Sequence, residues 1–598
     1  MYVKINKTSS GRKKLDYYRS YRDEDGKSRQ KFVERIGFID ELEKEFEDPV
    51  AHFRAEALRL TKLQQEQGGI PDSISLDTEA IIEVGSRARF NVGYSAIQKV
   101  YHDLELDKFF LQLQKSKNIK YSLNDIFKVL LYSRILKPAS KLSTFENKER
   151  YFEGFDFSLK DMYRALDVFN KSKNSLQKHL HHIVSKTQGS DTSIAYYDCT
   201  NYYFEITYND DDIVDEKGNI IKPGIRKKGF SKEHRPEPIV QMGLLMDNNG
   251  IPMAYDLFPG NQSEKTSLHP ILKRAKRDFN LNKTIVVADR GLNTSDNIFY
   301  NQTSYDGYVY AQTVRGASEK FKEYVLKQED YKEKDSGFKI KSRIHTKDIQ
   351  ILKNGKRTNT VTVIQKQVVF YSPDYAKKAK FERDKKVKKA MDLINNPGKY
   401  NSSTSRGAAN YVQEIEYDKK TGEIVNSKLL LNEAKIKEEE ALDGYYSIVT
   451  SEVEKSETEI LEIYRGLWKI EESFKIIKSE FKARPVYLST EEHIQAHFLI
   501  CFVSLVVIRI LNNEIGCQYS IKSIIRSLNK CECSLLEENI FMFDHMDEIL
   551  EVVQEKYGFN INKKYQTRQQ INNLLISSKK ATTAHKNKNR KTSLCAFK

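Results

Sequence analysis

Two short apolar segments, each closed by an aspartate, constrain the fold of this chain more than any other feature. Residues 193–198 read Ser-Ile-Ala-Tyr-Tyr-Asp, and residues 284–289 read Thr-Ile-Val-Val-Ala-Asp. Short runs of β-branched and aromatic residues are typical of strands, and unbroken apolar runs are typical of parallel strands that are covered on both faces. The sequence therefore predicts an α/β core in which Asp198 and Asp289 lie at strand ends.

A third carboxylate lies on a predicted amphipathic helix. Its apolar residues recur every three or four positions, which is typical of a helix that covers a core. They are Ile460, Ile463, Leu467, Ile470, Phe474, Ile477 and Phe481. At about 100° per residue, Glu471 lies at the edge of this stripe, on the face of Tyr464, Lys475 and Lys478. Glu472 points away from the stripe, toward solvent or another domain. The alternative for this helix is ordinary Glu–Lys pairing on a surface.

Each of these acids has an ordinary explanation when it is taken alone, because an aspartate after a strand is often a turn residue or a helix cap. Three carboxylates that converge, however, repel one another unless a cation neutralises them. Their oxygens suit Mg²⁺ or Mn²⁺, and two such ions can hold the attacking and leaving oxygens of a phosphodiester exchange. Asp198, Asp289 and Glu471 are therefore the predicted catalytic residues and metal ligands.

In these three residues the chain resembles a known family. Asp198, Asp289 and Glu471 look like the acidic triad of DDE transposases encoded by bacterial insertion sequences, of the IS-four-like group. Shorter resemblances lie at residues 229–236, 260–264 and 443–451. Together these similarities cover about residues 190 to 510.

One branch of this family carries the motif Tyr-x2-Arg-x3-Glu-x6-Lys. Tyr464, Glu471 and Lys478 match it, whereas Leu467 stands at the arginine position. Arg465 is the alternative for that arginine, but it lies on a different helix face.

The resemblance implies a function as well as a fold. It implies a ribonuclease-H-like catalytic core and a DNA transposase that binds the ends of an insertion sequence. The reaction would be metal-dependent DNA cleavage and strand transfer, with two Mg²⁺ or Mn²⁺ ions. The expected partners are the terminal inverted repeats and target DNA, bound by a homodimer. Two alternatives stay open: a ribonuclease-H-like nuclease without strand transfer, and a catalytically inactive DNA-binding repressor.

Basic and aromatic residues near the acids are the predicted DNA contacts, because ammonium, guanidinium and hydroxyl groups bind phosphates. They are Tyr464, Lys475, Lys478, Lys232, His234 and Arg235.

The chain is long enough for several domains. We expect the catalytic core to be interrupted by an inserted domain, with a mixed β and helical N-terminal region and a helical C-terminal region. The expected boundaries are 1–70 for a strand hairpin plus helix, 85–190 for a helical DNA-binding region, 191–316 and 451–515 for the core, 317–450 for the insertion, and 516–598 for the helical C-terminal region with its basic tail.

Composition agrees with a polyanionic partner, since the net charge is +16 and the sequence pI is about 9.1. Six cysteines without a regular spacing indicate a reducing compartment rather than a disulfide framework. The apolar run at residues 497–511 is too short to span a membrane and is expected to be a core helix. Without a targeting segment, the expected location is the cytoplasm, on the chromosome, with no membrane partner.

Overall fold

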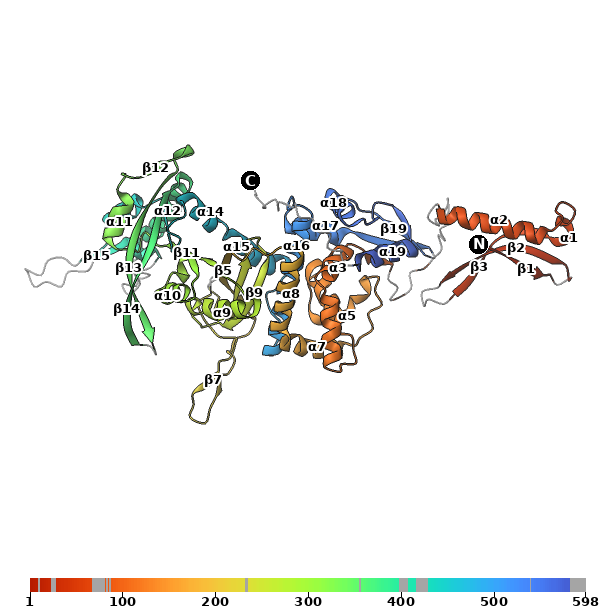
Figure 1. Cartoon of the computed structure of the whole chain (residues 1–598), viewed down its shortest axis with the longest axis horizontal. Helices are drawn as coiled ribbons and strands as arrows, with labels where there is room; N and C mark the ends of the chain where they lie inside the picture. The colour runs from red at the N-terminus through yellow and green to blue at the C-terminus, as the bar shows by residue number, and fades with distance from the viewer. Residues whose placement is uncertain are drawn as a thin grey trace, which may run out of the picture. The chain divides into compact units, whose positions relative to one another are not determined.

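A computed structural model gives the structure of this protein. It describes residues 1–8, 11–22, 28–66, 81, 84, 88–231, 235–353, 356–396, 407–415, 428–537 and 539–580. The chain forms two compact units (Figure 1). One comprises residues 190–472, and the other comprises residues 1–189 with 473–598. The predicted basic tail, residues 581–598, lies outside the described residues.

The described part of residues 190–472 is built on a nine-stranded mixed sheet, in the order β12-β13-β14-β17-β11-β10-β5-β8-β9. Its strands are β5 (Ile194–Tyr203), β8 (Ile239–Asp247), β9 (Pro252–Pro259), β10 (Ile285–Ala288), β11 (Gly307–Gln312), β12 (Lys332–Glu333), β13 (Lys339–Lys353), β14 (Lys356–Tyr371) and β17 (Tyr445–Thr450). Strand β10 runs parallel to β5 and to β11, and all other neighbours are antiparallel. The predicted α/β core is therefore confirmed as a mixed sheet with helices.

The two faces of the sheet carry different helices, because successive residues of a strand point to opposite faces. Ala195, Tyr197 and Cys199 of β5 are buried in one cluster with residues of α9 (Leu268–Phe279) and α10 (Ser295–Thr303). Tyr196 and Asp198 project from the other face, which we call the acid face. The helices α14 (Glu457–Arg465) and α15 (Trp468–Lys475) follow β17 and can be traced with α9 and α10 in Figure 1.

The hairpin of β8 and β9 forms around the turn at residues 248–250. Gly250 has a φ of +78°, which a residue without a Cβ adopts readily. Asp247 closes the turn: its Oδ1 accepts the Ile251 N–H at 2.8 Å, and its Oδ2 accepts the Ser190 hydroxyl at 2.9 Å. A carboxylate that is fully buried here costs solvation free energy, and burial raises the pKa of Asp247 to about 7.

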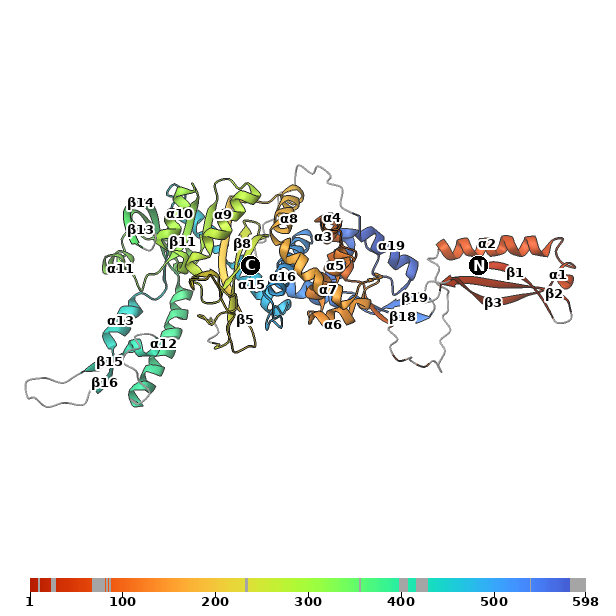
Figure 2. The ribbon, with the colours of Figure 1, turned by 90° about the horizontal axis from the view of Figure 1, so that it is seen from below.

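Residues 317–450, expected as an inserted domain, contribute four strands to the main sheet. The long pair β13–β14 joins it through β17, which lies between β14 and β11. The remaining elements are α11 (Glu319–Leu326), α12 (Pro373–Asn395), α13 (Glu433–Ala441) and the two-stranded sheet of β15 (Val412–Ile415) and β16 (Lys428–Leu431), seen in Figure 2. Asp443 ties this region together, because it pairs with Arg315 at 2.5 Å and also with Arg383.

The other unit begins with a three-stranded antiparallel sheet, β1 (Tyr2–Lys7), β2 (Lys13–Arg22) and β3 (Ser28–Phe38), which is followed by α1 (Ile39–Leu42) and α2 (Pro49–Glu66). The antiparallel pairing of β2 with β3 confirms the predicted hairpin, whose turn lies outside the described residues. Tyr17 of β2 packs edge-on against Phe53 of α2, which anchors the helix on the sheet.

Residues 94–187 are helical, as predicted. The helices are α3 (Tyr94–Asp103), α4 (Leu106–Ser116), α5 (Leu123–Leu136), α6 (Lys141–Glu146), α7 (Leu159–Lys171) and α8 (Lys173–Thr187). They pack around α16 (Glu491–Glu514), which contacts α3, α5 and α7. By length and mean hydropathy (2.2) α16 could cross a membrane, but 94% of that apolar window is buried inside the protein. Such burial is typical of a core helix.

The expectation of a helical C-terminal region is wrong in part. Helices α17 (Ile521–Lys530), α18 (Glu548–Tyr557) and α19 (Arg568–Ser578) alternate with β18 (Glu532–Glu537), β19 (Ile540–Phe543) and β20 (Tyr565–Thr567). These strands form a sheet with β4 (Arg89–Asn91), in the order β20-β19-β18-β4. The pairing partner lies more than 400 positions earlier in the chain, so no local pattern could reveal it. Cys531 and Cys533 are buried in this region.

The buried Asp247 predicts a pH dependence of local stability. Because its pKa is raised above that of an unfolded aspartate, the folded state binds the proton more tightly. This stabilisation is present below about pH 4 and is lost as the pH rises through about 7, by about 2–4 kcal/mol. Asp247→Asn should remove this component of the pH dependence. Hydrogen exchange of the β8 and β9 amides from pH 4 to 8 measures it. An unchanged pH profile in the variant would contradict the assignment to Asp247.

Candidate active site

The pairing of β5 with β10 places two aspartates side by side. In this parallel ladder Val287 lies beside Tyr196. Two residues further along both strands come Asp198 and Asp289. Neighbouring strands lie about 4.8 Å apart, and residues at the same level of a parallel pair project from the same face. The two carboxylates are therefore neighbours on the acid face.

Each carboxylate is oriented by the next residue of the chain. The Cys199 N–H donates to Asp198 Oδ1, and the Arg290 N–H donates to Asp289 Oδ1, both at 2.7 Å. Asp289 thereby caps the short helix at Arg290–Leu292. Asp198 is half-buried and Asp289 is exposed. Both acids are thus held by the main chain, with Asp289 open to solvent.

The expectation that both acids lie at strand ends holds for one of them. Strand β10 ends at Ala288, so Asp289 follows it directly. Asp198, in contrast, lies in the middle of β5, which continues to Tyr203. The reason is that β5 pairs with β8 as far as Tyr203–Ile239, beyond the end of the shorter β10.

The helix that carries Glu471 is interrupted, whereas the sequence pattern predicts one continuous helix. Helix α14 ends at Arg465, α15 begins at Trp468, and a π-helical turn follows at Ile476–Glu480. Between α14 and α15 the hydrogen bonds span three residues, as in Lys469 N–H to Gly466 O at 3.2 Å. A 3₁₀ turn advances about 120° per residue instead of 100°, so helical spacing cannot be extrapolated across it.

Gly466 at this interruption packs directly on the acid face. A Cβ at Gly466 would lie 1.9 Å from the Tyr196 hydroxyl oxygen, so only glycine allows the close approach. The same contact region holds Lys469, whose ammonium donates to the Asn248 main-chain oxygen at 2.7 Å and lies 5.3 Å from the Tyr196 ring centroid. The segment leading to Glu471 is therefore fixed over the strand that carries Asp198.

Tyr464 connects Glu471 electrostatically with the aspartates. Burial is the main cause that raises the pKa of Tyr464 far above its ordinary value, and the negative charges of Asp289 and Glu471 raise it further. Both carboxylates thus lie within electrostatic reach of the phenol. The hydroxyl stays protonated at neutral pH and can donate a hydrogen bond to an anionic oxygen.

The three acids do not form a closed metal site in the described part of the chain, where no group of three His, Cys, Asp or Glu side chains is close enough to hold an ion. The in-register pair nevertheless suits a divalent cation, because Mg²⁺ commonly uses one or two carboxylates together with water and substrate phosphates. Glu471 is exposed, whereas Glu472 is half-buried and its Oε2 has no contact with solvent. Glu472 was expected to face solvent or another domain, and the first of these alternatives is not met, because Glu472 is half-buried.

The other predicted contacts are less closely grouped. Lys475 is exposed and Lys478 is half-buried, and both belong to the unit that contains residues 473–598. Arg235 is exposed and its guanidinium lies 4.0 Å over the Tyr203 ring. Lys232 and His234 lie outside the described residues.

The two candidates for the motif arginine differ in burial. Leu467 is buried and contributes to the core, and Arg465 is exposed at the end of α14.

Two glycines of the motifs that carry the resemblance touch each other. A Cβ at Gly229 would lie 2.0 Å from the Gly260 carbonyl oxygen, and a Cβ at Gly260 would lie 2.1 Å from the Ile239 carbonyl oxygen. Gln241 fastens the same loop, because its amide donates to Gly260 O at 3.2 Å and to Gln262 O at 2.7 Å. These motif positions therefore support the loops beside β8 and β9.

Sequence reasoning missed a pair of tyrosines near Tyr464. Tyr446 of β17 and Tyr375 of α12 have ring centroids 4.2 Å apart, and each is 42% exposed. Tyr446 also stacks on Phe370 at 5.6 Å. The ladder from β10 through β11 to β17 puts Tyr446 on the acid face. The signal that could have found them is the pair Tyr445-Tyr446 within the motif at residues 443–451.

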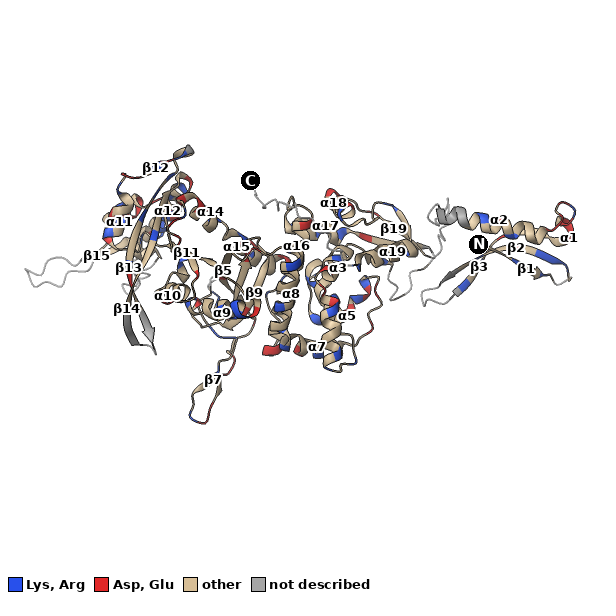
Figure 3. Ribbon diagram, in the orientation of Figure 1, with Lys and Arg blue, Asp and Glu red and all other residues tan. Residues whose placement is uncertain are grey.

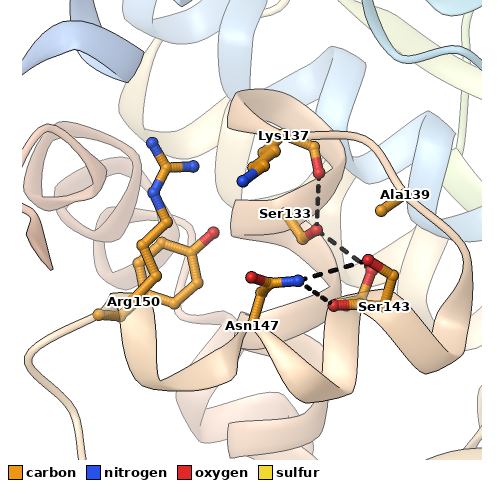
Figure 4. A pocket seen from close by; sticks show the side chains of 8 residues that line it. Ser133, Lys137, Ala139, Ser143, Asn147 and Arg150 are labelled. Carbon is orange, nitrogen blue, oxygen red and sulfur yellow. Dashed lines mark hydrogen bonds between the residues drawn. The ribbon is translucent and has the colours of Figure 1, made fainter. Parts of the chain in front are cut away.

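The other unit holds a small cavity between α5 and α6 (Figure 4). Its volume is about 20 Å³, room for about one water molecule. Its polar side chains bond within the cavity wall: the Ser133 hydroxyl donates to Lys137 O at 3.0 Å, and the Asn147 amide donates to Ser143 O at 2.7 Å. These bonds support the helix connection, and we assign no ligand to this cavity.

The close packing of Gly466 against Tyr196 can be tested by adding one methyl group to Gly466. Gly466 has φ −57° and ψ −14°, which alanine adopts without strain, so the contact alone decides the effect. Gly466→Ala should lower the free energy of unfolding by about 1–3 kcal/mol. Gly291→Ala, where a Cβ meets no atom within 4 Å, should change it by less than about 1 kcal/mol. Urea denaturation of both variants makes the comparison, and equal stabilities would refute the close packing.

Comparison with known proteins relates part of the chain to a family. Residues 222–507 match the family model described as the Transposase DDE domain. Curated protein sequences give no match. Among solved structures, the chain is similar to the piggyBac transposase in its synaptic complex with hairpin DNA, with 8% identity over 79% of each chain and a TM-score of 0.32. That TM-score does not establish a common fold. The family match begins after Asp198, contains Asp289 and Glu471, and supports a transposase.

Proposed function

We propose that this chain is a DNA transposase that binds the ends of an insertion sequence, cleaves DNA in a metal-dependent reaction and transfers the strand to target DNA. The observation that carries the proposal is the in-register pair Asp198 and Asp289 on the acid face, onto which Gly466 packs just ahead of Glu471. The family match at residues 222–507 supports the same function.

The order of the central strands supports a ribonuclease-H-like core. In the order β9-β8-β5-β10-β11, the antiparallel strands β5, β8 and β9 come first along the chain. Strands β10 and β11 follow and run parallel to β5. This arrangement brings the end of β10 beside the middle of β5. The two aspartates therefore meet because of the topology, although 91 positions of sequence separate them.

In this proposal Asp198 and Asp289 would hold Mg²⁺ or Mn²⁺, and the ion would supply positive charge at the scissile phosphodiester and lower the pKa of the attacking water or hydroxyl. The main-chain N–H groups of Cys199 and Arg290 keep the two carboxylates oriented before the cation binds. The Tyr464 hydroxyl, which stays protonated and lies within electrostatic reach of Asp289 and Glu471, would donate a hydrogen bond to a phosphate oxygen. Glu471, exposed over the acid face, acts as the third acid.

The finer parts of the assignment rest on the sequence resemblance. We propose Lys475, Lys478, Lys232, His234 and Arg235 as DNA contacts, and a homodimer as the form that brings two ends together. A nuclease without strand transfer is the alternative that shares the same acids. Pre-nicked end DNA distinguishes them, because only a transposase joins its 3′-hydroxyl to a target duplex.

Divalent metal should be required for cleavage. The paired carboxylates of Asp198 and Asp289 favour a hard cation, so Mg²⁺ or Mn²⁺ should support cleavage of DNA that carries the element end. Ca²⁺ should allow binding with little cleavage, because its looser coordination suits in-line displacement poorly. Gel analysis of products with each metal measures this. Full activity in excess chelator would end the proposal.

Two adjacent glutamates should behave differently. Glu471→Gln keeps the shape but removes the exposed charge, so cleavage should fall by about 100-fold or more while DNA binding persists. Glu472→Gln changes a half-buried carboxylate, so it should cost about 1 kcal/mol of stability and leave cleavage within a few-fold. Single-turnover cleavage and urea denaturation measure the two effects. An inactive Glu472→Gln beside an active Glu471→Gln would mean that the third acid is Glu472.

A further inference from the structure

Residues 190–472 contain a cavity of about 640 Å³. It lies past the carboxyl end of β11, between α11 and the β13–β14 pair. The same side of β13–β14 carries Ile349 and Val363, which pack in the cluster with α9 and α10. The cavity therefore opens on the face of the sheet opposite the acid face.

Within the described part of the chain, four arginine or lysine residues and one histidine line this cavity, and no aspartate or glutamate does. They are Arg290, Lys320, Arg343, His345 and Lys347. We call them the basic cluster. Arg343, His345 and Lys347 alternate along β13, so their side chains project from one face at steps of about 6.6 Å. This spacing is comparable with that of consecutive phosphates along an extended nucleic-acid strand.

The basic cluster is not neutralised by the protein. Among the residues that the structure describes, no carboxylate lies within ion-pair distance of any of its five members. Nearby arginines behave differently, because Arg315 and Arg383 both pair with Asp443. Lysine and arginine residues occur on both units (Figure 3), but a concave group of cations without acids is a place that favours an anionic ligand.

Arg343 is held in place by two contacts, and among the described residues only its Nε donates a hydrogen bond. Its Nε donates to Gln367 Oε1 at 2.9 Å, and its guanidinium lies 3.8 Å over the Tyr324 ring. This leaves both terminal amino groups for bidentate contact with a phosphate. The Gln367 amide in turn donates to Gln312 Oε1 at 3.2 Å, so the base of the cavity is a fixed hydrogen-bonded row.

The pKa shifts of two residues in the basic cluster agree with a local excess of positive charge. The pKa of His345 is lowered by burial first, and then by the positive charges of Arg343, Lys347 and Lys320. Burial also lowers the pKa of Lys347. A bound phosphate group would relieve this mutual repulsion.

We propose that the basic cluster binds the phosphodiester backbone of a DNA strand, as a second DNA-binding site on the opposite face of the sheet from the acids. The inference rests on the proposed function. Arg290 connects the two sites, because it lines the cavity and directly follows Asp289. The strand that is cleaved at the acids continues around the end of β10 into the cavity, so the cluster holds phosphates that neighbour the scissile one.

The test uses the full chain and two matched double variants. Lys320→Gln with Lys347→Gln removes two charges from the cavity. Lys273→Gln with Lys283→Gln removes two exposed charges from α9 and from the amino end of β10, away from Asp289. A fluorescein-labelled linear DNA duplex is titrated by anisotropy over a range of salt concentrations, and thermal denaturation verifies that both variants fold.

The cavity variant should reduce the slope of log affinity against log salt by about 2, whereas the control variant should match the wild type. Equal slopes and affinities for both variants would overturn the inference. So would saturation of the cavity by inorganic phosphate, seen as a thermal shift lost only in the cavity variant, without any difference in DNA binding.

The two proposals fail separately. If the wild type cleaves DNA with Mg²⁺ and the cavity variant binds like the control, the cavity inference is wrong and the proposed function stands. If the cavity variant loses salt slope but the wild type cleaves no DNA with any metal, the DNA site stands and the transposase proposal is wrong.

Discussion

The parallel pairing of β5 with β10 is the constraint on which the candidate active site depends. It fixes Asp198 and Asp289 at one level and on one face, because two residues beyond the pair Tyr196–Val287 come the two carboxylates. A shift of the register by one residue would turn one acid into the α9 side of the sheet, where Cys199 and Ala288 are buried. The apolar residues of β5 and β10 therefore fix the positions of both carboxylates, since only one register buries all of these apolar residues.

The third acid depends on a different contact. Glu471 is brought over the strands by Gly466, whose missing side chain lets the backbone approach the Tyr196 hydroxyl. Beyond this glycine the predicted apolar residues Leu467, Ile470 and Phe474 are buried, and Glu472 is the more buried of the two glutamates. Tyr464, just before the turn, lies within electrostatic reach of both Asp289 and Glu471. One close backbone contact therefore positions both the acid and a hydrogen-bond donor.

Charge is divided between the two faces of the same sheet. The acid face carries Asp198 and Asp289, and the opposite face carries the basic cluster around Arg343. Strands β13, β14 and β17 extend the core sheet sideways and do not form a separate layer. The alternating basic side chains of β13 therefore lie on the face of this same sheet that is opposite the acids. Arg290 lies at the boundary. Both faces meet at the carboxyl ends of β10 and β11, the edge where open α/β sheets commonly bind ligands.

Local sequence patterns were enough to predict the strands that carry the two aspartates. Continuous apolar runs predicted β5 and β10, and the apolar stripe that includes Ile470 and Phe474 predicted the helix that carries Glu471, because these burial patterns act over a few residues. The tertiary structure explains why β5 continues past Asp198, why the helix breaks at Gly466, and why β18 pairs with β4. It also assembled the basic cluster from β13, α11 and the end of β10. Each of these features depends on a partner far away in sequence, and a local pattern carries no information about such partners.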